Sequence, residues 1–411
     1  MLLEKQVKGR MISNFYHNRI LEIIYREPSI SRERIAQKTG LGASIIYRHV
    51  KELKNRRIIG ESGQRESEGG RRTELLSINP KGGYLIGASI RKDKLICVLS
   101  DLSGKILQSM SEELETVDKV RSIVSQLSKG INKIIKNGGF SLSQIYGVGV
   151  GTPGVLDVDR KIGIANIHVN DWRNIPIKEM IQTEINLPVF LENNNNLTAL
   201  AENRFGQGKG ISSFLALDIS FGIGMGVFLD GHPYIGTQGR AGEVGHIQLD
   251  PDGPFCTCGN RGCLESLVSI PSLVRQAKEA ISQGVVSEIV QLANNNIDNI
   301  EIEMIYEAMH KHDKLAINLM QKAADNIGLV IGNIVNLLNP EIIILGGEIN
   351  KAGQEFLDML NQSTEKNKFL PDTHFKTVYS KLSYPQSVAM GAIALVQKKI
   401  FIDNEINILE I

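Results

Sequence analysis

Three of the chain's four cysteines fall within one short stretch, residues 242–265, which reads GEVGHIQLDPDGPFCTCGNRGCLE. With a preceding histidine they form the pattern H-x9-C-x-C-x4-C, made by His246, Cys256, Cys258 and Cys263. One imidazole and three thiolates match a closed tetrahedral zinc site, and the interspersed glycines let the backbone turn tightly around one ion. We therefore predict a structural Zn2+ here. The alternative is a disulfide with a spare thiol, although a single residue between two cysteines makes a poor bridge.

Size and charge restrict the class of protein. The 411 residues, 42% of them apolar, predict two to three globular domains. Residues 1–80 carry 16 Lys and Arg against 9 Asp and Glu, a net charge of +7, whereas the whole chain carries +1, which leaves −6 for the rest. A basic first part on an acidic body indicates a nucleic-acid partner for that part only. The sequence shows neither a signal-peptide pattern nor a bilayer-spanning apolar run, so we expect no membrane association and a cytoplasmic location.

The first eighty residues follow the order of a winged helix-turn-helix domain. Residues 14–26 predict a helix that Pro28 ends, and Ser31 is a good N-cap for a second, short helix over residues 32–39. A third helix is predicted over residues 43–57, followed by a hairpin with a polar, glycine-containing tip. We expect exposed residues of the third helix and of the wing to contact double-stranded DNA, namely Ser44, Tyr47, Arg48, Lys51, Arg71 and Arg72. The alternative is a small helical protein-interaction module.

Beyond about residue 80 the pattern changes to strands that alternate with helices, which predicts an α/β body with mixed sheets. The predicted strands include residues 84–90 and 145–151, and the predicted helices include residues 117–137 and 313–338. Two βββαβα units with a cleft between them make the actin-like, sugar-kinase-type fold. The expected units are a DNA-binding domain over residues 1–80, a first lobe over 81–198 completed by about 385–411, and a second lobe with the zinc knuckle over 199–384.

This body resembles the ROK family (repressors, open reading frames and sugar kinases) from about residue 84 to residue 395. The matching segments are GVGVGTPGVLD, LENNNNLTALAE, FGIGMGVFLDG, GRAGEVGH, CTCGNRGCLES, IIILGG and AMGAIAL, and the cysteine-rich one is the most diagnostic. With the winged helix in front, the chain resembles the family's repressor branch, including its xylose-type and N-acetylglucosamine-type regulators. The resemblance implies a homodimer, or a tetramer built from it, that binds a palindromic operator and a glucose- or xylose-like monosaccharide effector.

The resemblance also bears on catalysis. In the family's kinases an aspartate that follows Glu-Asn acts as general base on the sugar hydroxyl, and Asn194 stands at that position here. An amide can hydrogen-bond a hydroxyl but cannot take its proton at neutral pH. The family's glycine-rich phosphate loops are replaced by SIRKD at residues 89–93 and SFG at residues 220–222. We therefore expect no catalytic residue and no enzyme activity. The alternative is an active sugar kinase that also binds DNA.

The same resemblance implies a sugar site whose polar groups survive. A pyranose presents several hydroxyls, each a donor and an acceptor, and converging carboxylates and amides match that chemistry. The residues implied are Asn193, Asn194, Glu243, His246, Glu265, Gly154 and Asn166. Each also has a structural explanation, since Glu243 could be a surface charge, His246 a metal ligand only, and Glu265 a favourable charge at a helix start. A third alternative is a DNA-binding adaptor that docks another protein in place of a sugar.

Overall fold

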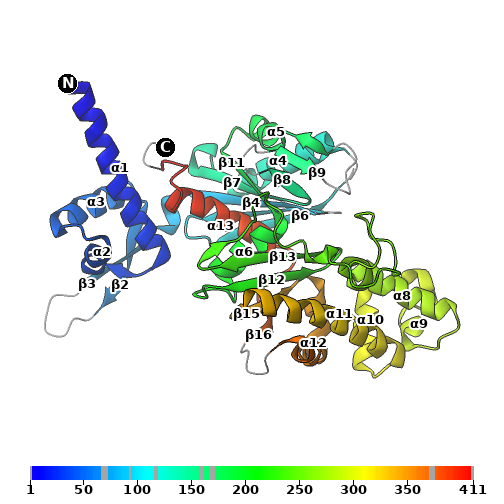
Figure 1. Ribbon diagram of the computed structural model, residues 1–411. Helices are drawn as coiled ribbons and strands as arrows, with labels where there is room; N and C mark the ends of the chain where they lie inside the picture. The colour runs from blue at the N-terminus through cyan, green and yellow to red at the C-terminus, as the bar shows by residue number, and fades with distance from the viewer. Residues whose placement is uncertain are drawn as a thin grey trace.

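The computed structural model of the protein describes residues 2–65, 73–91, 94–114, 119–157, 162–165, 172–369 and 375–408. A small N-terminal head stands beside a larger body that is built on two sheets (Figure 1). This architecture confirms the predicted fold class, a winged helix-turn-helix followed by a two-lobed α/β body. Among the described residues, no helix is long and apolar enough to cross a membrane.

The head contains three helices and a three-stranded antiparallel sheet in the order β1-β3-β2. Its elements are α1 (Leu2–Arg26), β1 (Ile30–Ser31), α2 (Arg32–Thr39), α3 (Ala43–Asn55), β2 (Ile59–Arg65) and β3 (Thr73–Ile78). The predicted cap is present, because Ser31 Oγ accepts a hydrogen bond from the amide of Arg34 at 3.2 Å. Gly40 ends α2 in the left-handed conformation, with φ of 69°.

Helix α1 differs from its prediction at one end, because it begins at Leu2 and not at residue 14. The prediction was based on the stripe of Ile20, Leu21 and Ile24, which is buried in the second half of the helix. The preceding residues, LLEKQVKGRMIS, are mostly good helix formers without proline, so helix propensity continues beyond the buried stripe.

The first lobe is built on a five-stranded sheet in the order β11-β7-β4-β5-β6. A meander of three antiparallel strands is extended by two parallel ones, β7 beside β4 and β11 beside β7. Its strands are β4 (Tyr84–Ile90), β5 (Lys94–Asp101), β6 (Ile106–Glu113), β7 (Ile145–Thr152) and β11 (Val189–Asn193), and its helices are α4 (Val120–Gly138) and α5 (Ile177–Ile185). A small antiparallel sheet adds β8 (Val155–Asp157), β9 (Ile162–Ala165) and β10 (Arg173–Ile175).

The second lobe has a sheet of the same design, in the order β14-β13-β12-β15-β16, with β15 and β16 parallel to β12. Its strands are β12 (Phe214–Ile219), β13 (Ile223–Leu229), β14 (His232–Pro233), β15 (Ile342–Gly346) and β16 (Lys376–Tyr379). Its helices are α7 (Leu264–Val268), α8 (Ile270–Ser282), α9 (Glu288–Leu292), α10 (Ile302–His310), α11 (Lys314–Leu338) and α12 (Gly353–Asn367). The repeated design confirms the predicted pair of similar units.

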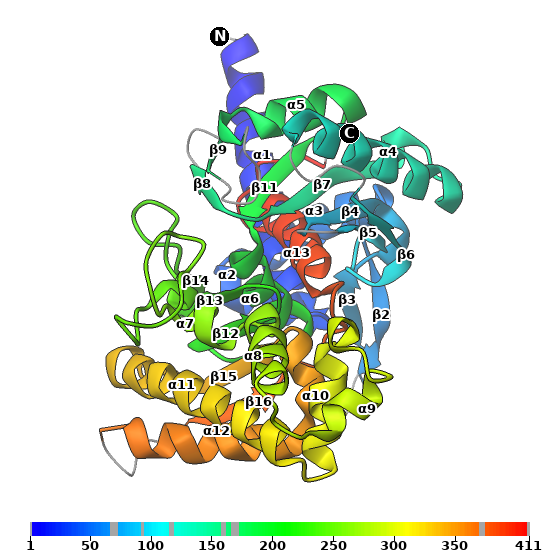
Figure 2. The ribbon, with the colours of Figure 1, turned by 90° about the vertical axis from the view of Figure 1, so that its right-hand side faces the viewer.

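Two buried helices, α6 (Asn194–Phe205) and α13 (Ser387–Phe401), lie between the two sheets (Figure 2). Their backbones touch, because a Cβ added to Gly391 would lie 1.9 Å from the carbonyl oxygen of Leu197. Gly87 and Gly149 give α13 the same close approach to β4 and β7. Helix α13 therefore ties the end of the chain to the first sheet.

The head shares its apolar core with the first lobe. Ile20, Leu21 and Tyr25 of α1 belong to the same buried cluster as Ile393 and Phe401 of α13. The rings of Tyr25 and Phe401 stack with centroids 5.1 Å apart. The head is thus packed against the body by an apolar contact.

Candidate functional site

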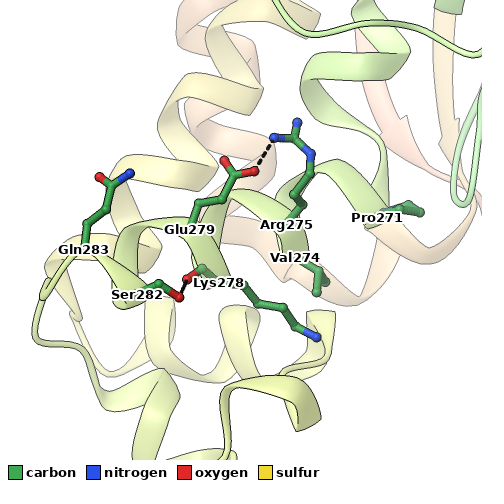
Figure 3. A pocket seen from close by; sticks show the side chains of 7 residues that line it. All are labelled: Pro271, Val274, Arg275, Lys278, Glu279, Ser282 and Gln283. Carbon is green, nitrogen blue, oxygen red and sulfur yellow. Dashed lines mark hydrogen bonds and ion pairs between the residues drawn. The ribbon is translucent and has the colours of Figure 1, made fainter.

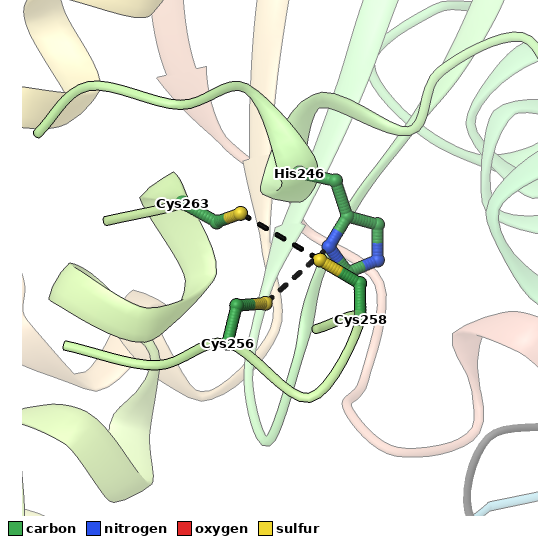
Figure 4. A group of neighbouring side chains, drawn as sticks. All are labelled: His246, Cys256, Cys258 and Cys263. Carbon is green, nitrogen blue, oxygen red and sulfur yellow. Dashed lines mark hydrogen bonds between the residues drawn. The ribbon is translucent and has the colours of Figure 1, made fainter. Parts of the chain in front are cut away.

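The four predicted metal ligands converge in the second lobe (Figure 4). Their ligand atoms all lie within 4.8 Å of one another. Cys256 Sγ lies 3.6 Å from His246 Nδ1, and Cys258 Sγ lies 3.7 Å from Cys263 Sγ. Tetrahedral bonds of about 2.0 Å to nitrogen and 2.3 Å to sulfur place two ligand atoms roughly 3.5–3.8 Å apart, so these separations match a shared ion. All four cysteines of the chain are free, and 3.7 Å is far longer than a disulfide bond.

Backbone hydrogen bonds shape the loop over residues 246–263, which we call the knuckle. The amide of Cys256 donates to the carbonyl of Asn260, and the amide of Leu249 donates to that of Gly262, each at 2.8 Å. Gly262 has a φ of 59°, and a Cβ there would lie 1.6 Å from a backbone oxygen. Burial beside the other two thiols raises the pKa of Cys263 to about 12. A donor set packed so closely fits a cation, which would stabilise the thiolates.

Two acidic residues flank the knuckle, and one of them contacts the start of β13. Glu265 accepts a hydrogen bond from the amide of Ile223 at 3.0 Å, while it also occupies the first turn of α7. Glu243 is exposed as a residue, yet desolvation of its carboxyl group raises its pKa. The neighbouring charge of Glu265 raises the pKa of Glu243 further, and His246 opposes the rise. Glu243 therefore lies close enough to His246 and Glu265 for their charges to shift its pKa.

The glycines of the segment FGIGMG allow other parts of the site to approach β13 closely. A Cβ on Gly222 would lie 2.8 Å from Glu265 Oε2, and one on Gly224 would lie 2.1 Å from Asn195 Nδ2. A Cβ on Gly242, in the loop before the knuckle, would lie 1.8 Å from the backbone of β13. These glycines thus bring α6 and the knuckle loop onto one strand.

The asparagine run at the start of α6 is held by specific contacts. Asn193 Nδ2 donates to the carbonyl of Gly154 at 2.8 Å, and its Oδ1 accepts from the amide of Asn195 at 2.7 Å, which caps α6. Asn194 Nδ2 donates to the carbonyl of Ile90 at 3.1 Å. Asn194 Oδ1 is buried and has no hydrogen-bond partner among the described residues. This oxygen faces Gly151, because a Cβ added there would lie 2.5 Å from it.

The two altered loops lie beside these residues, because Ile90 accepts from Asn194 and Gly222 packs on Glu265, and they contact the chain's own side chains. Arg91 donates to the hydroxyl of Tyr384 at 2.8 Å, and its guanidinium lies 4.6 Å from the centre of that ring. The Tyr384 hydroxyl donates in turn to Glu348 at 3.5 Å. Ser220 donates to Asp218 at 2.5 Å and accepts from the amide of Glu348 at 3.3 Å. Burial raises the pKa of Tyr384 to about 12, although Arg91 opposes this.

The head presents most of its predicted DNA contacts on one helix. Four of them are exposed on α3, namely Ser44, Tyr47, Arg48 and Lys51. The guanidinium of Arg32, from α2, lies 5.7 Å from the centre of the Tyr47 ring. The remaining predicted residues lie outside the described residues, namely Arg71 and Arg72 of the wing, Asn166 of the sugar set, and Lys92 and Asp93 of the first altered loop.

Two features of the structure were not predicted from the sequence, namely the contact between Arg91 and Tyr384 and the buried pair of His17 and His49. The contact between Arg91 and Tyr384 joins residues 293 positions apart, and no local pattern marks it. The pair of His17 and His49, each 1% exposed, was visible in principle. His17 precedes Ile20 by three positions, and His49 precedes Leu53 by four. Residues at these spacings lie on one face of a helix, so the sequence indicates that both histidines are buried.

A hollow on the surface of the second lobe is separate from these residues (Figure 3). It runs along one face of α8, where Arg275 pairs with Glu279 at 2.9 Å. Its lining consists of Pro271, Val274, Arg275, Lys278, Glu279, Ser282 and Gln283. No residue of the predicted sugar or metal sets belongs to that lining.

Comparisons with known proteins relate both parts of the chain to one group. Residues 85–399 match the ROK family, and residues 16–59 match winged helix-turn-helix DNA-binding domains. The xylose repressor of Bacillus subtilis (strain 168) is 30% identical over 400 residues, covering 94% of each chain.

Two solved structures match different lengths of this chain. A ROK family transcriptional regulator, a homologue of the E. coli Mlc protein, is 27% identical with a TM-score of 0.81, covering 95% of this chain and 97% of its own. A ROK family glucokinase from Streptomyces griseus, in complex with glucose and AMPPNP, is 27% identical with a TM-score of 0.67, covering 76% of this chain and 99% of its own. The kinase thus matches a body-sized part, whereas the regulator matches nearly the whole chain.

Proposed function

Because this chain belongs to the ROK family, we propose that it is a transcriptional repressor whose affinity for DNA responds to a sugar. The observation that carries the proposal is the combination, in one chain, of a DNA-binding type of head with a kinase-like cleft that keeps its sugar-side polar groups. The xylose repressor and the solved regulator, which match nearly the full length, support the same combination.

The proposed effector is a monosaccharide of glucose- or xylose-like shape, bound between the lobes. Asn194 Oδ1 offers a buried acceptor without a partner, and Glu265 offers carboxylate oxygens at the start of β13. Hydroxyl groups that donate to both would satisfy them. The full proposed contact set remains Asn193, Asn194, Glu243, His246, Glu265, Gly154 and Asn166. The glucose-bound kinase and the xylose repressor among the similar proteins support this class of ligand.

We propose further that the chain does not phosphorylate its sugar. Asn194 supplies an amide where a general base would be needed, and removing such a base lowers a rate by roughly 10²–10⁴-fold. Arg91, Tyr384 and Glu348 bond to one another beside the altered loops. The rival is an active kinase, and it predicts ADP release with a sugar panel that depends on Glu265.

The metal proposed for the knuckle is a structural Zn2+ held by His246, Cys256, Cys258 and Cys263. Four protein ligands leave no open position, so the ion would fix the loop and would not activate water. The chain's own contribution is orientation, since His246 and Glu265 lie on the two segments that the ion would join.

The proposed DNA target is a palindromic operator bound by a homodimer, because two-fold symmetry in the protein presents two heads to two half-sites. Each head would place α3 in the major groove, with Ser44, Tyr47, Arg48 and Lys51 facing the duplex. Arg71 and Arg72 would reach the minor groove. The boundaries at residues 80 and 198, and the completion of the first lobe by residues 385–411, stay predictions.

Two measurements test the proposal. Full-length protein is screened by thermal shift against monosaccharides and disaccharides, and operator affinity is measured by fluorescence anisotropy with and without each stabilising sugar. We expect at least one aldose to raise the melting temperature and to change operator affinity by 5-fold or more, which is about the usual range of coupling between sites. An operator affinity that no sugar changes would refute the effector role. A protein that no sugar stabilises would favour the adaptor alternative.

A further inference from the structure

Helix α6 joins the cleft to the head. Its first residues, Asn194 and Asn195, lie at the proposed sugar site, and its penultimate residue, Arg204, reaches α1 of the head. Its twelve residues span about 18 Å, so one rigid element covers the distance between the two.

Arg204 caps the end of α1 from outside the head. Its Nη1 donates to the carbonyl oxygen of Tyr25 at 3.2 Å, and its guanidinium lies 4.1 Å from the centre of the Tyr25 ring. The amide that would continue the helical ladder, Ser29 N, instead donates to Leu76 at 3.1 Å. The carbonyl of Tyr25 therefore depends on Arg204, and a cation at this position also favours the negative end of the α1 dipole.

The surroundings of Arg204 are closely packed and hydrogen-bonded. Its Nε donates to Gln397 Oε1 at 3.3 Å, and the fully buried Gln397 is fixed by donating to the carbonyl of Leu102 at 3.0 Å. Helix α6 is in backbone contact with α13 at Gly391, and most of its residues are buried. Close-packed interfaces of this kind shift as units.

Within the head, α1 is in turn fixed to the helix proposed to read DNA. His17 Nε2 of α1 lies 3.1 Å from His49 Nδ1 and 3.3 Å from Glu52 Oε2, both of α3. Burial lowers the pKa of His17 to about 4, so this contact is made by neutral imidazole at pH 7. A movement of α1 is therefore passed to α3 through a buried polar contact.

We propose that Arg204 is the positioning residue that couples sugar occupancy at the start of α6 to the orientation of the head. This inference rests on the proposed function. A sugar that prefers one position of the asparagines at residues 193–195 also selects one position of Arg204, and with it one position of the α1 end. Arg204 itself contacts neither sugar nor DNA, so its substitution alters the link between two affinities more than either affinity.

The test compares full-length wild-type protein with Arg204→Ala. Operator affinity, on a palindromic duplex selected with the wild-type protein, is measured with and without saturating D-xylose or D-glucose, and sugar affinity is measured by calorimetry. We expect the ratio of operator affinities to fall from at least 5-fold to below about 2-fold. Sugar affinity should stay within about 3-fold of the wild type. Arg204→Lys should restore part of the ratio, because it keeps the charge but loses the forked donor.

Two matched controls isolate the contact. Arg26→Ala removes the neighbouring exposed arginine, which pairs with Glu22 at 2.9 Å, and Tyr25→Phe keeps the ring under Arg204. Both should retain the wild-type ratio. An unchanged ratio in folded Arg204→Ala overturns the inference and leaves the repressor proposal intact. A wild-type protein that binds sugar and operator without any coupling overturns the repressor proposal itself.

A measurement on the wild type alone covers the case in which Arg204→Ala does not fold. Hydrogen exchange of the last turn of α1 is followed with and without sugar. We expect sugar to change protection there, because the bond to Tyr25 O closes that turn. Exchange that changes only around residues 193–196 and 242–265 overturns the inference.

Discussion

The proposed sugar side, with Asn194 and Glu265, and the proposed nucleotide side, with Arg91, Tyr384 and Glu348, differ in the partners of their polar groups. On the sugar side, Asn194 and Glu265 are oriented by backbone contacts, yet Asn194 keeps a buried acceptor without a partner. On the nucleotide side, Arg91, Tyr384 and Glu348 bond to one another.

Both sides keep buried polar atoms without a partner among the described residues, namely Asn194 Oδ1 on the first and Ser89 Oγ and Asn350 Oδ1 near the second. The contrast therefore lies in the contacts of the charged side chains, because Arg91 is engaged by Tyr384. This difference agrees with the proposal that the protein binds a sugar and does not phosphorylate it.

The largest expected effect comes from the knuckle that supports the sugar side. Cys258→Ser should lower zinc content and weaken sugar binding by about 100-fold or more, because loss of one ligand frees the loop that carries His246. Metal analysis and calorimetry measure this, and operator binding without sugar should persist. Cys97→Ala, which changes the buried cysteine of the first lobe, is the control. Metal-free protein with unmodified thiols and normal sugar affinity would contradict the scaffold role.

A smaller effect is expected when one carboxylate of the proposed sugar side, that of Glu265, is replaced. Glu265→Gln keeps an oxygen for the amide of Ile223 but removes the charge, so sugar affinity should fall by about 10- to 100-fold. Calorimetry with D-xylose and D-glucose measures the change. Glu279→Gln, in the hollow on α8, should leave sugar affinity unchanged. Equal effects of both variants would mean that Glu265 acts only on the fold.

On the nucleotide side, a stability effect should follow pH. Burial raises the pKa of Glu348 above its ordinary value of 4.5, so between these two values the folded state holds a proton that the unfolded state has released. Wild-type stability therefore falls as pH rises through that window and then levels off. Glu348→Gln has no such proton, so its stability relative to the wild type should grow from pH 4 upward. Urea unfolding of both proteins at several pH values measures this. A difference in their free energies of unfolding that does not change with pH would contradict the raised pKa of Glu348.

The smallest effect is expected for Asn194→Asp, which restores a carboxylate at the position of the family's general base. This variant should still not phosphorylate a sugar. Asn194→Asp supplies a carboxylate, but the nucleotide side remains occupied by Arg91 and Tyr384. A coupled ADP-release assay should therefore stay at background with every sugar that binds. Turnover in this single variant would break the comparison between the two sides. Turnover only after Arg91→Gly is added would sharpen it.

Much of the fold was predictable because its signals are local. The strands over residues 84–90 and 145–151 and the helix over residues 313–338 have clear periodicity, and they appear as β4, β7 and α11. The four metal ligands also lie within 18 residues of sequence, so their spacing alone indicates a cluster.

The missed contacts are long-range and depend on how elements pack. The pair of Arg204 and Tyr25 brings together residues 179 positions apart, and Arg204 has no sequence pattern that separates it from a solvent-facing helix charge. The start of α1 was missed for another reason, since helix propensity continues through residues 2–13, before the apolar stripe on which the prediction was based. Packing decides such cases, and one sequence records packing only indirectly.

The stacking of Tyr25 on Phe401 has a consequence for synthesis of the chain. The head precedes the body in the sequence, but the surface on which α1 rests is completed by α13, more than 300 residues later. A nascent chain, or one stopped before residue 387, holds its three head helices without the wall that orients them. A chain that lacks α13 is therefore expected to keep a folded head without a fixed position on the body, and to bind an operator less tightly.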